Sequence, residues 1–75
     1  MVVLVTNDVN QMNILEWELI TNRIDYRLNH RNLFGLEPPY LIVNGVPIDF
    51  ERSMIWIKEH SNGWKNFSEY YKWWK

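Results

Sequence analysis

The stretch EPPYLIVNGVPIDF, residues 37–50, decides how the rest of the chain is arranged. A proline pair precedes a short run of mostly branched apolar residues at 40–43, which predicts a β-strand. Asn44-Gly45 is the strongest short signal for a two-residue hairpin turn, because both central positions favour a positive φ. A second strand is expected at 46–48, and its proline restricts it to a sheet edge because proline has no N–H to donate. A helix over 51–60 is expected to follow.

The N-terminal half predicts a β-α-β unit. Residues 2–5 are all apolar, as in a central strand that is covered on both faces. A polar loop with several possible helix N-caps follows, and then an amphipathic pattern predicts a helix over about 10–22. Residues 24–29 alternate between apolar and polar side chains, which predicts a strand with one exposed face.

The two halves together predict β-α-β followed by β-β-α, and residues 37–50 resemble the matching part of glutaredoxins and of glutathione-transferase N-terminal domains. The resemblance implies an α/β fold of the thioredoxin-like (glutaredoxin-like) type. Its β-α-β-β-α core would contain a four-stranded mixed sheet in the order 2-1-3-4, with Pro39 as the family's cis-proline. The family's redox loop, which carries Cys-x-x-Cys, matches the positions Val9, Asn10, Gln11 and Met12. Neither thiol is present there, so the resemblance implies a redox-inactive member.

Composition excludes several classes of function. The 75 residues suit one domain, and the lack of cysteine rules out disulfides, thiolate zinc sites and thiol catalysis. His30 and His60 are not spaced as a ligand pair, so we expect no metal and no cofactor. A formal net charge of −1 argues against a nucleic-acid partner, and no run approaches transmembrane length. We therefore expect a soluble, cytoplasmic protein that is not bound to a membrane.

A glutathione site is the ligand site that the resemblance implies. Pro39 and Tyr40 match the backbone element that pairs with the tripeptide, and Glu51 lies near the acidic position that holds its amino group in glutathione transferases. The Gly-Gly of glutaredoxins is replaced by Asp49-Phe50. The alternative is that Glu51 is an ordinary first-turn acid, favoured there by the helix dipole.

The aromatic content exceeds what so small a domain buries: five tryptophans, four tyrosines and three phenylalanines. Excess apolar surface of this kind usually ends in a protein contact. The segment 30–37 is too short for the helix that glutaredoxins place there, so the second face of the sheet needs another cover. Part of that cover can come from Leu33, Phe34 and Leu36.

We divide the chain into a glutaredoxin-like domain, 1–63, and an aromatic tail, 64–75. At 100° per residue an apolar stripe of the tail falls within an arc of about 120°, which predicts a helix that packs on the domain or on a partner. The stripe consists of Trp64, Phe67, Tyr70, Tyr71 and Trp74, with Lys65, Glu69 and Lys72 opposite. The candidate partner-binding residues are Trp17, Trp56, Trp73 and Trp74.

We therefore expect a redox-inactive glutaredoxin-like module that is not an enzyme and that binds a protein partner or forms a homo-oligomer. It is similar to small degenerate redoxins of phage genomes, which act as assembly or host-interaction factors. One alternative is a glutathione-binding protein or a non-thiol enzyme that uses Tyr40 and Glu51. Another is a structural subunit of a larger assembly.

Overall fold

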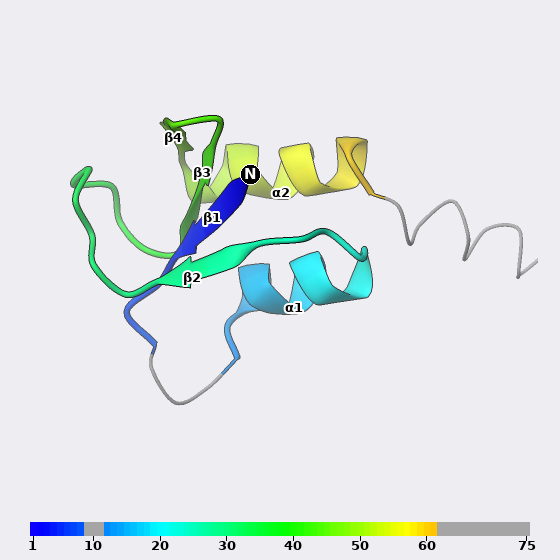
Figure 1. Cartoon of the computed structure of the whole chain (residues 1–75), viewed down its shortest axis with the longest axis horizontal. Helices are drawn as coiled ribbons and strands as arrows, with labels where there is room; N and C mark the ends of the chain where they lie inside the picture. The colour runs from blue at the N-terminus through cyan, green and yellow to red at the C-terminus, as the bar shows by residue number, and fades with distance from the viewer. Residues whose placement is uncertain (9–11, 62–75) are drawn as a thin grey trace, which may run out of the picture.

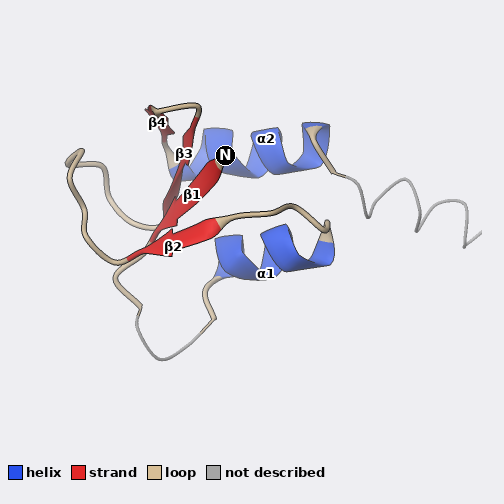
Figure 2. Ribbon diagram, in the orientation of Figure 1, coloured by secondary structure: helices blue, strands red, loops and turns tan. Residues whose placement is uncertain are grey.

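The computed structural model describes residues 1–8 and 12–61, which form a four-stranded sheet and two helices (Figures 1 and 2). The predicted tail, 64–75, lies outside the described residues. Neither helix of the described part is both long and apolar enough to cross a membrane. The elements are β1 (Val2–Val5), α1 (Ile14–Thr21), β2 (Arg27–Asn29), β3 (Tyr40–Val43), β4 (Val46–Ile48) and α2 (Phe50–Glu59).

The sheet is mixed, and its strand order is β2-β1-β3-β4. β1 pairs in parallel with β2 and antiparallel with β3, which in turn pairs antiparallel with β4. The predicted order and the central place of β1 are therefore confirmed. β4 is a sheet edge, as predicted from the proline at position 47, which has no N–H to donate. Within the β3–β4 pair, Pro47 lies opposite Ile42.

The β3–β4 hairpin closes through the predicted two-residue turn. Asn44 has φ 52° and Gly45 has φ 81°, so both central positions occupy the left-handed region. This is the conformation that a hairpin turn of the I′ type requires, and glycine adopts it without the steric cost that a Cβ brings. The turn thereby fixes the register in which Val43 faces Val46.

The start of α1 corrects the prediction of a helix from about residue 10. The helix begins at Ile14 because Asn13 is its N-cap, and the Asn13 side chain accepts a hydrogen bond from the Glu16 N–H at 2.9 Å. The amide of Asn13 also donates to the buried hydroxyl of Thr6. This second bond anchors the helix start to the end of β1.

β2 is shorter than predicted. The expected strand covered 24–29, but only Arg27–Asn29 pairs with β1. The Ile24 N–H instead donates to the Leu19 carbonyl at 2.9 Å, so this residue belongs to the C-terminal turn of α1. The predicted apolar alternation still holds at Ile24 and Tyr26, which pack into the core. The prediction for α2 was accurate to one residue at each end.

Both helices pack on the same face of the sheet, where they run side by side in the same direction (Figure 1). The core there consists of Val2, Leu4, Leu15, Leu19, Ile24, Leu41 and Ile57. On the opposite face Val5 and Tyr40 are fully buried, whereas Val3 and Ile42 are half-buried. Leu33 and Phe34 remain 66% and 50% exposed, so they give that face little of the cover that was expected of them.

Candidate functional site

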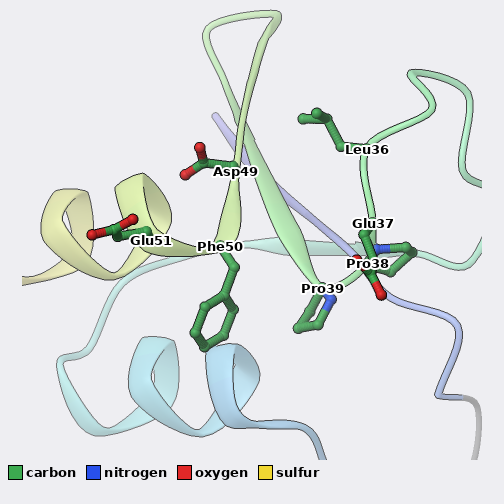
Figure 3. A pocket seen from close by; sticks show the side chains of 7 residues that line it. All are labelled: Leu36, Glu37, Pro38, Pro39, Asp49, Phe50 and Glu51. Carbon is green, nitrogen blue, oxygen red and sulfur yellow. The ribbon is translucent and has the colours of Figure 1, made fainter.

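An open pocket of about 350 Å³ lies where the loop before β3 meets the N-terminus of α2. Figure 3 shows one wall formed by residues 36–39 and the other by residues 49–51. The lining residues are Leu36, Glu37, Pro38, Pro39, Asp49, Phe50 and Glu51. The pocket therefore joins the two ends of the stretch from which the sequence analysis started.

The first wall follows from the proline pair and from one asparagine. The Pro38–Pro39 bond is cis, as the family resemblance predicted. Asn32 ties the loop to the sheet: its Oδ1 accepts from the Tyr40 hydroxyl at 2.6 Å, and its Nδ2 donates to the Leu36 carbonyl at 2.7 Å. Sequence reasoning missed Asn32, because a single loop asparagine carries no distinctive signal.

The second wall is the start of α2, which the sequence specifies locally. Asp49 is the N-cap, and its Oδ1 accepts from the Arg52 N–H at 2.8 Å. Glu51 lies in the first turn, where the helix dipole favours a carboxylate. Between them Phe50 lines the pocket and keeps 39% of its surface exposed, so part of an apolar residue is open to solvent at this wall.

Ser53 holds the two walls in position. It is completely buried in α2, its hydroxyl accepts from the Leu41 N–H at 3.0 Å, and it donates to the Ile48 carbonyl at 3.2 Å. One side chain thus connects α2 to β3 and to β4. A sequence signal existed: Ser53 lies three residues after Phe50 and four before Ile57, so on a helix it shares a face with these apolar side chains.

The pocket is acidic and partly apolar. Among the residues that the structure describes, the charged lining groups are the carboxylates of Glu37, Asp49 and Glu51, and the other lining residues are apolar. Within residues 1–8 and 12–61, the lining includes no hydroxyl, thiol, imidazole or amine. This arrangement suits binding of a ligand that combines an apolar group with positive charge.

The structure brings some of the predicted site residues together and separates others. Pro39 and Glu51 line the same pocket. The Tyr40 side chain does not line it, because it is fully buried and its hydroxyl is bonded to Asn32. Of the positions that match the redox loop, 9–11 lie outside the described residues, and Met12 is 51% exposed ahead of α1.

The two described tryptophans among the predicted partner-binding residues lie away from the pocket. Trp17 is 61% exposed on α1. Trp56 is half-buried against the core and stacks on His60, with ring centroids 4.3 Å apart. Trp73 and Trp74 lie outside the described residues.

The structure contains one clearly shifted ionisable group among the described residues, and it is remote from the pocket. Burial raises the pKa of Tyr26 to about 12, and the 2.9 Å hydrogen bond that Tyr26 donates to the Glu16 carboxylate adds to the shift. This bond fastens the chain before β2 to α1, which is a structural role.

Within residues 1–8 and 12–61, no group of three or more histidine, cysteine or acidic side chains is placed to hold a metal ion. Comparison of the chain with protein-family models, with curated proteins and with solved structures finds no match. The site must therefore be interpreted from its own geometry.

Proposed function

We propose that the chain is a redox-inactive, glutaredoxin-like domain of the thioredoxin fold that binds a protein partner in the pocket between residues 36–39 and the start of α2. Three features support the fold assignment: the strand order β2-β1-β3-β4, the β-α-β and β-β-α halves, and a cis-proline directly before β3. The chain has no cysteine, so recognition would remain after the redox chemistry is lost.

The observation that carries this proposal is the composition of the pocket. Phe50, Pro38 and Pro39 provide apolar contact surface, and three acidic residues, Glu37, Asp49 and Glu51, belong to the same lining. A partner segment that places an apolar side chain against Phe50 and basic side chains near Glu37 and Glu51 would satisfy both properties. Charge complementarity of this kind mainly sets specificity and association rate, while a buried apolar anchor supplies affinity.

A peptide selection tests the proposal. A displayed library of short peptides is selected against the immobilised full chain, and the affinity of the enriched peptides is then measured by calorimetry. We expect basic residues on both sides of an aromatic or aliphatic residue. Phe50→Ala and Glu51→Gln should each weaken binding by about tenfold or more, equivalent to roughly 1.4 kcal/mol.

Two matched variants on the same helix serve as controls. Ile55 is 51% exposed and Glu59 is exposed, and neither lines the pocket. Ile55→Ala and Glu59→Gln should therefore leave the affinity unchanged. Enriched peptides that bind equally well to the Phe50→Ala and Glu51→Gln variants would contradict the proposed site.

A glutathione-binding role is the second candidate, and one observation favours it: Pro39 and Glu51 line the same pocket. Asp49 and Phe50, however, occupy the positions of the family's Gly-Gly, and their side chains take up room beside the backbone. We therefore expect glutathione to bind weakly. A calorimetric dissociation constant below about 0.1 mM, or about 5.5 kcal/mol of binding, would favour this second candidate over the first.

A further inference from the structure

The outer edge of β2 carries backbone groups that no described strand pairs with. β2 lies at one end of the sheet order β2-β1-β3-β4 that the described residues form. The Thr6 N–H donates to the Asn29 carbonyl at 3.0 Å, so the polar backbone groups of Asn29 face β1. Because successive residues of a strand alternate, the N–H and C=O of Leu28 face away from β1. This edge can therefore pair with a further strand.

The opposite edge of the described sheet is less suited to pairing. There the central residue of β4 is Pro47, which has no N–H. Val43 and Val46 face each other across the closing pair of the hairpin, so Pro47 is the residue of β4 whose backbone points outward. Of the two edges of the described sheet, only that of β2 presents both a donor and an acceptor at its central residue.

The charged side chains along the β2 edge are placed symmetrically about Leu28. Asp25 lies three residues before it and Arg31 lies three residues after it, and both are exposed. The Asn29 Oδ1 accepts a hydrogen bond from the Arg31 N–H at 2.9 Å, which holds Arg31 at the end of β2. An antiparallel strand of the same sequence, centred on Leu28, would therefore set each Asp25 opposite an Arg31.

This symmetry makes the edge self-complementary, as an interface between two identical copies must be. Charged residues on an edge strand normally prevent pairing with another chain. Here opposite charges occupy mirror positions, and opposite charges directly across a strand pair are stabilising. We propose that two copies of the chain associate through their β2 edges, antiparallel and centred on Leu28, to form one continuous sheet.

The neighbouring registers are less favourable. A register centred on Arg27 would set two arginines directly opposite each other, which is destabilising. A register centred on Tyr26 would pair Leu28 with Ile24, whose N–H is already donated to the Leu19 carbonyl at 2.9 Å. The register centred on Leu28 avoids both costs.

Exposed apolar side chains lie along the same edge. Leu28 is 46% exposed and points to the helix-covered face of the sheet, because it is paired with the core residue Leu4. α1 lies beside the chain before β2 on that face, where Glu16 accepts the hydrogen bond from Tyr26 (Figure 1). One helical turn after Glu16, Ile20 is 45% exposed. Since opposite residues of a strand pair point to the same face, the α1 helices of both copies would lie on one side of the continuous sheet.

A charge swap tests the proposal. Analytical ultracentrifugation of the full chain over a range of concentrations gives the dimer dissociation constant, and we expect a reversible monomer–dimer equilibrium. Asp25→Arg and Arg31→Asp should each raise this constant by about tenfold or more, because each turns two attractive cross-strand pairs into repulsive ones. The double variant that carries both substitutions should restore the wild-type value. Glu59→Arg and Arg52→Asp are the matched controls, since they make the same charge changes at exposed positions of α2.

Leu28→Pro tests the backbone contact independently of charge. The Leu28 N–H faces away from β1, so proline removes a hydrogen bond of the dimer and leaves the pairing of β2 with β1 intact. We expect this variant to be monomeric while its far-UV circular dichroism stays that of the wild type.

Each outcome has a defined meaning when circular dichroism shows that the variants are folded. Dimerisation that either single swap weakens and the double swap restores supports the proposal. A wild-type chain that is monomeric at every concentration overturns it, and so does a folded double variant that stays monomeric. A dimer that survives Leu28→Pro but is lost when residues 64–75 are deleted assigns the contact to that segment, which also overturns the proposal.

Discussion

Removing the Ser53 hydroxyl should destabilise the domain strongly, although the change deletes only one oxygen atom. Ser53 is completely buried and bonds to the Leu41 N–H and the Ile48 carbonyl. Each bond is worth about 1 kcal/mol net, with more lost where a buried partner is left unsatisfied. Alanine gains about 0.5 kcal/mol of helix propensity, which offsets part of the loss. We expect Ser53→Ala to cost about 1.5–3 kcal/mol.

This loss is measurable by urea unfolding followed by far-UV circular dichroism, with a thermal melt as a second probe. The midpoint temperature should fall by roughly 6–24 °C, since a domain of this size shifts by about 4–8 °C per kcal/mol. Thr21→Ala is the matched control, because it also deletes a helical hydroxyl, one that is exposed and bonded to the Trp17 carbonyl. It should change stability by less than about 0.5 kcal/mol. If both variants lose equally little, Ser53 does not connect α2 to the sheet.

Three further predictions follow from other contacts. Because the pKa of Tyr26 is raised in the folded state to about 12 from an ordinary value of 10.0, its contribution to stability is full below pH 10 and is lost as the pH rises towards 12; Tyr26→Phe should abolish this loss in alkaline unfolding curves. Gly45→Ala should cost about 1–2 kcal/mol in urea unfolding, because its φ is 81° although a Cβ would meet no atom within 4 Å. Deleting residues 64–75 tests the expectation that this aromatic segment packs on the domain or on a partner: packing on the domain predicts a loss of stability in urea unfolding, and a truncated chain of unchanged stability would contradict it.

The sheet was predictable from the sequence because its determinants are local. The hairpin depends on Asn44-Gly45, and the edge position of β4 depends on the missing N–H of Pro47. Asn44-Gly45 and Pro47 each lie within two or three residues of the turn or the strand that they specify. The central place of β1 followed from its uninterrupted apolar run, because a strand that is apolar on both faces needs cover on both faces.

The errors arose where tertiary contacts choose between equally good local options. Several polar residues before α1 could cap it, and Asn13 is the one that also donates to Thr6 at the end of β1. The pattern at 24–29 alternates like a strand, but the Ile24 N–H is taken by the Leu19 carbonyl and is lost to the sheet. Neither the bond of Asn13 to Thr6 nor the bond of Ile24 to the Leu19 carbonyl can be identified before the packing of α1 is known.

The same reasoning applies to the candidate site. The cis bond at Pro39 was predicted from the resemblance, and the helix at the second wall was predicted to within one residue, but its Asp49 N-cap was not predicted although it is a local signal. The relative position of the two walls was not predicted, because it depends on Asn32 and Ser53, which bond to residues 8 and 12 positions away in the sequence, across element boundaries. Only the serine left a trace in the sequence, as a small polar residue on an apolar helix face.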